Sequence, residues 1–352
     1  MSTRPRIYLD YNASAPLSPE ARAAMSDAMA DVGNPSSVHA EGRRARDRVE
    51  RARREVAELL GRPREQVIFT SGGTEANYLG VLALAAVAEK RGMPRVIATT
   101  PFEHPSLRGA VAALAARGWQ VVTDPAGASV VTGALVNHEL GTLHDVAGPL
   151  VHVDAVQAAG KLDLRNLRTD SIAISAHKIG GPQGVGALAL AVDEGLPLIE
   201  AGHQERGRRP GTENVLGIVG FGAAAAALDV AAWPAVKALG DRLEAGILAI
   251  PRTRIHGADR PRVGGTINAG FAGARGQDLV IALDLAGIAA STGAACTSGS
   301  VQPSPVLLAL GLSPEAALEA VRFSLGRATT EDDIDQALSA LPRLVERARL
   351  HR

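Results

Sequence analysis

Six short β-rich runs that alternate with turns and helical patterns constrain the fold of this chain more than any other feature. The runs cover residues 67–70, 95–99, 120–123, 133–137, 150–154 and 171–175. Strands that alternate with helices predict an α/β fold with a mostly parallel central sheet. The link 138–149 is near the minimum length of a parallel crossover, so we expect no full helix there. A charged amphipathic helix is expected over 41–60, ending near Gly61.

The last hundred residues follow a different pattern and predict a second, smaller α+β domain with a boundary near residue 240. A strand-like stretch covers 263–267, and helices are expected over 277–286, 313–321 and 331–348. The helix at 313 has a strong start, because Ser313 is a good N-cap and Pro314 suits the first helical position.

Composition excludes several classes of protein. The 37 basic and 37 acidic side chains cancel, so charge gives no case for binding nucleic acid or a membrane surface. The chain starts without an apolar signal region, and the apolar stretch 217–228 is too short to span a bilayer, so the cytoplasm is the expected compartment. A single cysteine excludes an intramolecular disulfide and a thiolate zinc cage, and no metal site is expected.

Polar and ionisable residues follow one predicted strand after another. In open parallel sheets, ligands bind outside the carboxyl ends of the strands, so this recurrence predicts a site at that edge. The residues are Ser71-Gly72-Gly73-Thr74-Glu75, Glu103-His104, His138-Glu139, Asp154 with Gln157, and Ser175 with His177-Lys178. The convergence is a stronger signal than any one of these motifs.

The run 71–74 lies between a strand and an expected helix. Its glycines let the backbone approach an anion, and the helix N-terminus favours phosphate. A plain strand-to-helix turn with Thr74 as the cap explains the run equally well. It is not a P-loop, because the Gly-Lys-Ser/Thr ending is missing.

Lys178 is one of only four lysines, with Lys90, Lys161 and Lys237. A desolvated lysine has a lowered pKa and can form a Schiff base. The alternative is a surface lysine at the end of a strand, but Lys178 alone sits at the predicted ligand-binding edge. Asp154 ends an apolar strand, and a buried carboxylate there needs a cationic or donor partner such as a protonated pyridine nitrogen or an arginine. The alternative is a structural cap.

Three more side chains have both a functional and a structural interpretation. His104 can cap a helix, lie in the core or stack on an aromatic cofactor. Cys296 is surrounded by small residues, which favours a reactive thiol on an exposed loop over a buried structural one. Arg322 can clamp a carboxylate through two hydrogen bonds or form a structural ion pair.

Motifs along nearly the whole chain resemble those of cysteine desulfurases of the pyridoxal-phosphate-dependent class V aminotransferase-like family. They are residues 9–12, 33–37, 69–77, 103–104, 152–157, 175–178, 209–214, 295–299 and 322–326. The resemblance implies the pyridoxal-phosphate fold type I, with a large cofactor-binding domain over 15–240. A small domain would contain 1–14 and 241–352 and carry the loop of Cys296.

The resemblance also implies roles for individual residues. Lys178 would hold pyridoxal 5'-phosphate and later move the Cα proton, Asp154 would pair with the pyridine nitrogen, and His104 would stack on the ring. Cys296 would attack the substrate sulfur and leave a protein persulfide. The remaining implied contacts are Gln157 to the ring hydroxyl, Gly73, Thr74, Ser175 and His177 to the phosphate, His138 at the ring, Thr212 to the cofactor of a partner subunit, and Arg322 and Asn12 to L-cysteine.

The implied activity is removal of sulfur from L-cysteine, giving L-alanine and a persulfide for a protein acceptor. The run 295–299 resembles the long-loop subgroup that serves iron–sulfur cluster assembly. His138 and His144 stand where the family usually has Asn and Gln, and the segments 124–132 and 142–150 and the C-terminus are short. The alternatives are a selenocysteine lyase, an aminotransferase of the same fold, or a catalytically idle partner protein.

Overall fold

The computed structural model describes residues 6–192, 201–293 and 302–350, which form two compact units. The large unit comprises Ala15–Leu135 and His144–Val230, and the small unit comprises Met1–Ser14, Val136–Leu143 and Ala231–Arg352. Within the described residues no single helix has the length and apolar character needed to cross a membrane. Among these residues, only the bent pair Val215–Ala226 and Val230–Leu248, taken together, meets that test of length and composition.

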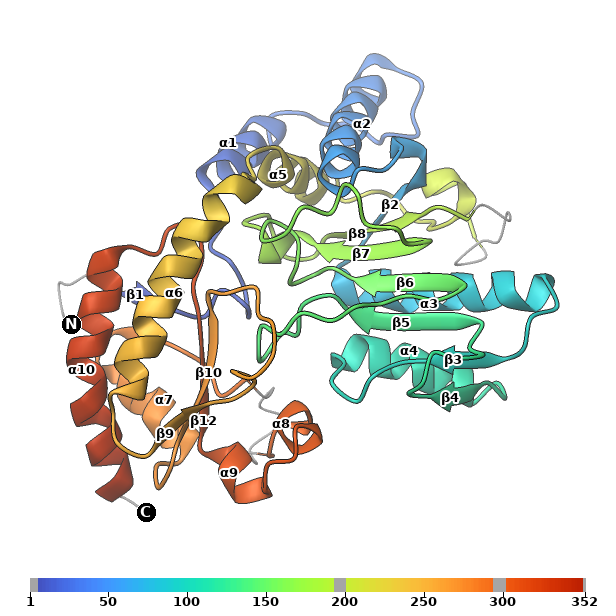
Figure 1. Ribbon diagram of the computed structural model, residues 1–352. Helices are drawn as coiled ribbons and strands as arrows, with labels where there is room; N and C mark the ends of the chain where they lie inside the picture. Colours follow the sequence, from blue (N-terminus) through green and yellow to red (C-terminus); the bar gives the residue numbers. More distant parts are fainter. Residues whose placement is uncertain (1–5, 193–200, 294–301, 351–352) are drawn as a thin grey trace. The chain divides into compact units, whose positions relative to one another are not determined.

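A seven-stranded sheet organises the large unit (Figure 1). Its spatial order is β2 (Val67–Thr70), β8 (Gly186–Leu190), β7 (Ser171–Ser175), β6 (Leu150–Asp154), β5 (Val130–Ala134), β3 (Val96–Ala98) and β4 (Gln120–Val122). Only β8 runs antiparallel to its neighbours, so the carboxyl ends of the other six strands lie at one edge. The prediction of a mostly parallel α/β sheet is confirmed.

Helices cover this sheet in two groups. In the first, α3 (Gly73–Lys90) packs on β6, β7 and β8, and α4 (Pro105–Ala115) packs on α3. Their apolar side chains form a core with buried residues of the strands, such as Ile68 and Leu188. The second group consists of α1 (Pro19–Ala28), α2 (Ala40–Leu60) and α5 (Val215–Ala226), which pack together near β2 and β8 (Figure 1). As predicted, α2 ends at Gly61, which adopts the left-handed conformation that favours glycine.

The small unit contains the three-stranded antiparallel sheet β12–β10–β9. Three helices, α6, α7 and α10, pack on this sheet or on one another, and β1 pairs with β11 in parallel. The elements are β1 (Ile7–Tyr8), α6 (Trp233–Leu248), β9 (Thr253–Ile255), β10 (Thr266–Phe271), α7 (Gly276–Leu285), β11 (Ile288–Ala289), α8 (Pro305–Ala309), α9 (Pro314–Leu318), β12 (Ala320–Ser324) and α10 (Glu331–Leu350).

Some sequence-based boundaries are wrong. The strand expected over 133–137 is β5 at Val130–Ala134, because all five of those residues are buried in register with β6. The stretch expected over 263–267 begins three residues later, as β10. The helix expected over 313–321 ends at Leu318, because the next residues pair with β10 as β12. As expected, the link between β5 and β6 contains no helix.

The expected boundary near residue 240 falls inside α6, which packs on β9, β10 and α10 of the small unit. The units instead divide between Val230 and Ala231. Residues Val136–Leu143 also belong to the small unit rather than to the 15–240 domain. Backbone hydrogen bonds from Leu143 to Pro261 (2.8 Å) and from Val263 to Gly141 (3.0 Å) hold this segment there.

Candidate functional site

The carboxyl edge of the seven-stranded sheet brings together most of the residues predicted from the strand ends. The cross-strand register places Thr70 and Ser175 on either side of Gly186, and Ala134 and Ala173 on either side of Asp154. The turn at 71–72 follows β2, Glu103 and His104 follow β3, and His177 and Lys178 follow β7. Thr212, in contrast, is exposed in the segment before α5.

The N-terminus of α3 is open to an anion. Its N-cap is Gly72, and within the described part of the chain no side chain caps the first turn. A Cβ atom at Gly73 would lie 2.8 Å from Val156 Cγ2, so only glycine fits there, whereas one at Gly72 would meet no atom within 4 Å. Because uncapped N–H groups at a long helix favour phosphate, the anion interpretation of this run is favoured over a turn capped by Thr74.

Asp154 is buried at the end of β6 and accepts one hydrogen bond on each carboxylate oxygen. Val156 N–H donates to Oδ1 (2.9 Å), and Asn77 Nδ2 donates to Oδ2 (2.7 Å). Burial raises the pKa of Asp154, although both donors and the charge of Lys178 act in the opposite direction. A cationic partner at this position would favour the ionised form of the carboxyl group.

Lys178 ends a short 3₁₀ turn, Ala176–Lys178, directly after β7, and its side chain is half-buried. Its charge acts on His104, His177 and Asp154 and lowers the pKa of each, so these four groups share one electrostatic environment. Burial is the larger effect on the two histidines and, with the lysine, lowers the pKa of each to about 4. Both imidazoles are neutral at pH 7, which suits ring stacking and hydrogen bonding near a cationic lysine.

His104 is the N-cap of α4, which confirms the first of its three sequence interpretations. Its Nδ1 accepts from Ser106 N–H (3.1 Å) and lies 2.8 Å from Ser106 Oγ. A cap uses only Nδ1, so the capping role leaves the ring face available for a cofactor.

Gln157 is buried in a turn rather than in a helix, and its Oε1 accepts from Lys161 Nζ (3.2 Å). His144 lies beside Phe102, with the ring centroids 6.1 Å apart.

These residues fit pyridoxal phosphate, the cofactor implied by the sequence motifs. The protonated ring nitrogen would be a cationic partner for the buried Asp154, and the uncapped start of α3 would take the phosphate. Lys178 supplies an amine in the same environment. The chemistry of the donor set therefore matches a ring with a cationic nitrogen, an aldehyde and a phosphate.

Sequence reasoning missed how the loop before α5 is anchored. Arg53 donates to both carboxylate oxygens of Glu205 (2.6 and 2.8 Å), and this buried pair holds Glu205 in a left-handed conformation. Arg209 Nε donates to Glu75 Oε1 (2.9 Å), and Ser71 N–H donates to Glu75 Oε2 (2.6 Å). Glu75 thus connects the start of α3 to the segment that leads to Thr212.

Asn12, His138 and Arg322 belong to the small unit. Arg322 lies in strand β12, which follows α9, and is buried. It donates to Asp10 Oδ1 (2.7 Å) and to the His138 carbonyl (3.2 Å), while its Nε has no hydrogen-bond partner among the described residues. Asn12 Nδ2 donates to the same carbonyl (3.1 Å) and to Thr266 Oγ1 (3.0 Å). Arg322 therefore forms an ion pair with Asp10 and still has its Nε–H as an unused donor. Cys296 lies outside the described residues.

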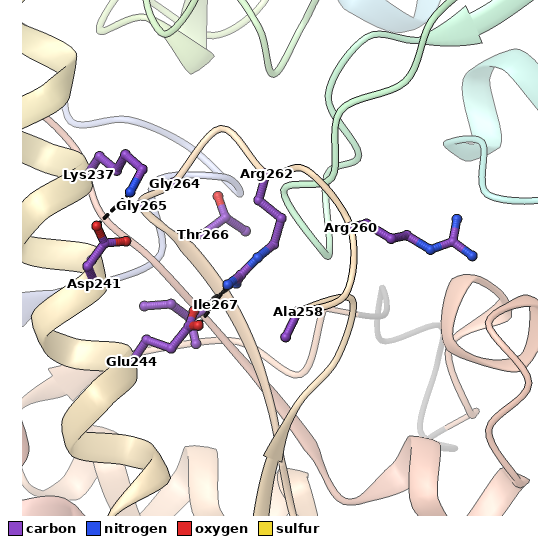
Figure 2. Close-up of a pocket in the computed structure, with 11 residues that line it drawn as sticks. Lys237, Asp241, Glu244, Ala258, Arg260, Arg262, Gly264, Gly265, Thr266 and Ile267 are labelled. Carbon is purple, nitrogen blue, oxygen red and sulfur yellow. Dashed lines mark hydrogen bonds and ion pairs between the residues drawn. The ribbon is translucent and has the colours of Figure 1, made fainter.

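A separate pocket of about 180 Å³ lies in the small unit, and none of the predicted site residues that the structure describes line it (Figure 2). Two ion pairs neutralise much of its wall. Arg262 forms two hydrogen bonds with Glu244 (2.7 Å each), and Lys237 pairs with Asp241 (2.6 Å). Because these charges are already paired, we assign this pocket no ligand.

Glu103 is a buried carboxyl group beside the site, and its effect on stability is testable. Oε1 accepts from Thr100 Oγ1 (2.6 Å) and Oε2 from Ala134 N–H (2.8 Å). Burial raises the pKa of Glu103 from 4.5 to about 7, and the charge of Asp154 adds to this. Between these two values the folded state keeps a proton that the unfolded state releases. Stability from this group is therefore full below pH 4.5 and is lost as the pH rises to 7.

Glu103→Gln imitates the protonated group, so we expect the variant to gain stability relative to wild type between about pH 5 and pH 8. The shift from 4.5 to about 7 sets an upper limit of roughly 3 kcal/mol. Urea unfolding followed through Trp119, which is buried in the large unit, measures the difference. Glu58→Gln on the exposed face of α2 is the control. Equal pH dependence in wild type and Glu103→Gln would contradict the expectation.

The chain matches the family model for aminotransferase class-V over residues 7–131 and 125–337. It is 40% identical to a cysteine desulfurase of Enterobacter agglomerans over 377 residues, which cover 97% of this chain and 93% of that protein. It is 38% identical to the cysteine desulfurase NifS of Azotobacter vinelandii over 381 residues, with coverage of 97% and 93%.

Solved structures agree with these relatives. A NifS-like protein aligns with a TM-score of 0.84 and 30% identity, over 97% of this chain and 99% of that one. A NifS-like protein from Rickettsia africae aligns with a TM-score of 0.81 and 27% identity, over 97% and 99%. The likeness confirms the pyridoxal-phosphate fold type I as the fold class. The chain therefore belongs to the aminotransferase class-V family, among its cysteine desulfurases.

Proposed function

We propose that the chain is a pyridoxal-phosphate-dependent cysteine desulfurase. It would convert L-cysteine into L-alanine and leave the sulfur as a persulfide on Cys296. The observation that carries the proposal is the shared environment of Lys178, Asp154 and His104 at the carboxyl edge of the sheet, beside an uncapped helix N-terminus. The similarity to cysteine desulfurases over nearly the whole chain supports it.

Each residue at this edge has a task in holding the cofactor. Lys178 Nζ would bind it covalently, Asp154 would pair with the ring nitrogen, and His104 would lie on the ring face. Gln157 and His138 would contact the ring, and the phosphate contacts are assigned to Gly73, Thr74, Ser175 and His177. Thr212 would reach the phosphate in a partner subunit, which implies a homodimer. When bound, the cofactor stabilises negative charge at the substrate Cα.

The reaction itself depends on two nucleophilic or basic side chains. Lys178 would take the proton from the substrate Cα and return a proton later. Cys296, as a thiolate, would form a sulfur–sulfur bond with the substrate while the carbon–sulfur bond breaks, and the electron pair of that bond stays on carbon. Protonation of this carbon gives alanine. Arg322 and Asn12 would hold the substrate carboxylate, for which the unused Nε of Arg322 is suited.

The persulfide would then pass to a protein acceptor, and an iron–sulfur scaffold in the cytoplasm is the acceptor class we propose. The NifS name of one relative and the run 295–299 support this choice. The group-transfer chemistry requires the persulfide sulfur to meet an acceptor thiolate, so a cysteine of the acceptor takes the sulfur.

Cys296→Ser tests the proposed function. With L-cysteine and a thiol reductant, we expect wild type to release alanine and sulfide in equal amounts. The variant should keep the visible absorption of the bound cofactor, because Cys296 is assigned no part in holding it, while sulfide release falls at least about a hundredfold. Since this is the only cysteine, a persulfide-reactive label should modify wild type and not the variant. Normal sulfide release by Cys296→Ser would refute the persulfide mechanism, and transamination without sulfide would indicate an aminotransferase.

A further inference from the structure

A chain of buried hydrogen bonds in the large unit connects Asp154 to His104 through a single side-chain amide, that of Asn77 in α3. Asn77 Nδ2 donates to Asp154 Oδ2 (2.7 Å) and to Ser106 Oγ (2.9 Å). Ser106 Oγ in turn lies 2.8 Å from His104 Nδ1. Asn77 is 1% exposed, so water does not replace any of these contacts. One amide therefore contacts both the partner of the ring nitrogen and the side chain that positions His104.

The direction of every hydrogen bond in this chain follows from the carboxylate. A carboxylate only accepts, so the NH2 group of Asn77 must face Asp154, and its second proton goes to Ser106 Oγ. Ser106 then donates its hydroxyl proton to His104 Nδ1, which leaves the remaining proton of the neutral imidazole on Nε2. The backbone N–H of Ser106, which also donates to His104 Nδ1 (3.1 Å), requires the same tautomer.

The hydrogen bond at Asn77 Oδ1, the other end of the amide, also has a defined direction. Asn77 Oδ1 can only accept, so His152 Nε2, 3.1 Å away, carries a proton, and His152 Nδ1 accepts from Ser171 Oγ (2.9 Å). Burial lowers the pKa of His152 to about 3, which keeps this ring neutral. Gly80, one turn after Asn77, makes room for the ring, because a Cβ there would lie 2.4 Å from His152 Nδ1. In this network Asn77 is the side chain that donates to Asp154.

We propose that Asn77 is a positioning residue of the cofactor site, which fixes the Asp154 carboxylate and, through Ser106, the ring of His104 to the same helix whose N-terminus receives the phosphate. The proposal rests on the proposed function, because it assigns the roles of Asp154 and His104 toward the cofactor. Asn77 itself does not act on the substrate. It holds in place two groups that come from different elements, the end of β6 and the N-cap of α4.

Loss of the amide has a defined electrostatic consequence. Without its donor at Oδ2, the pKa of Asp154, already raised by burial, rises further, and the carboxyl group tends toward its neutral form. In the cofactor-bound protein, Asp154 would then no longer hold a proton on the ring nitrogen. A positive charge on the ring nitrogen would repel the proton on Lys178 Nζ. Without that charge, Lys178 Nζ would keep its proton to higher pH.

The test is a pH titration of the visible absorption of the substrate-free holoenzyme. In Asn77→Ala and Asn77→Leu we expect the midpoint of the absorption change to move upward by about one pH unit or more. We also expect cofactor affinity, measured by equilibrium dialysis, to fall about tenfold. The leucine variant keeps most of the side-chain volume, so a folded protein remains for the measurement if the alanine cavity is too destabilising.

Ser171→Ala is the matched control, because it deletes a buried hydrogen bond of the same network that does not touch Asp154. Its midpoint should remain within about 0.3 unit of wild type, since no charged group loses a partner. An unchanged midpoint in both Asn77 variants, or an equal shift in Ser171→Ala, overturns the proposal while the proposed function stands. If wild type itself binds no pyridoxal phosphate, the proposed function fails and the positioning role fails with it.

Discussion

Lys178→Ala should lose both the visible absorption of the bound cofactor and at least about a thousandfold of desulfurase activity. The expected loss is this large because one amine is assigned two tasks, covalent attachment of the cofactor and transfer of the Cα proton, and proton transfer alone typically contributes about a hundredfold or more. The structure supports the assignment, because the charge of Lys178 acts on Asp154, His104 and His177 together. Absorption spectra and alanine formation from L-cysteine measure the two losses.

Lys90→Ala is the control for this prediction. Lys90 is exposed at the last turn of α3, so its removal should leave both spectrum and rate unchanged. A free primary amine can replace a missing lysine in proton transfer, so added methylamine should restore part of the alanine formation in Lys178→Ala. Full activity in the variant without added amine would show that another residue carries the chemistry.

Asp154→Asn should reduce kcat for alanine formation by about a hundredfold to a thousandfold, the size of effect seen when one preorganised electrostatic partner is removed. The substitution conserves shape but replaces an acceptor oxygen with an NH2 group. That group would face either the Asn77 amide or the Val156 N–H, both of which are donors. It also removes the negative charge of the Asp154 carboxylate, which we propose pairs with the ring nitrogen. Lys178 remains, so the cofactor should still be covalently bound.

Asp163→Asn is the matched control, because Asp163 is exposed and its pairing with Arg165 is confined to the surface. Rates, and the pH midpoint of the visible band, should equal those of wild type. In Asp154→Asn the midpoint should move upward, as in Asn77→Ala, because both changes weaken the same charge. A wild-type rate in Asp154→Asn would contradict the assignment of Asp154 to the ring nitrogen.

The local residue pattern was sufficient to predict those elements in which the apolar positions of the sequence are also the buried positions of the structure. The strands β2, β6 and β7 have the predicted bounds, because each is a short, mostly apolar run whose last residue is polar. The amphipathic helix α2 and its stop at Gly61 were also predictable, since spacing and a glycine suffice. Ser313 and Pro314 correctly predict where α9 begins but not where it ends.

Elements that depend on a distant partner were not predictable in the same way. Local pattern does not reveal the strand β8, because its five residues are small or apolar and only pairing with β2 and β7 makes them a strand. Likewise β12 has the composition of a helix end, yet it pairs with β10. The segment Val136–Leu143 belongs to the small unit because it bonds to residues more than about a hundred positions away in sequence.

The sequence by itself determined the chemistry available to this protein: one thiol, four lysines, and polar residues placed after successive strands. The hydrophobic pattern of alternating strands and helices implies parallel strands, so the common edge of Asp154, His104 and Lys178 follows from the sequence alone. Only the tertiary structure decided that Asn77 contacts Asp154 and Ser106, and that Glu75 contacts Arg209. Those contacts join residues from different elements, and their hydrogen bonds form only when the intervening core has packed.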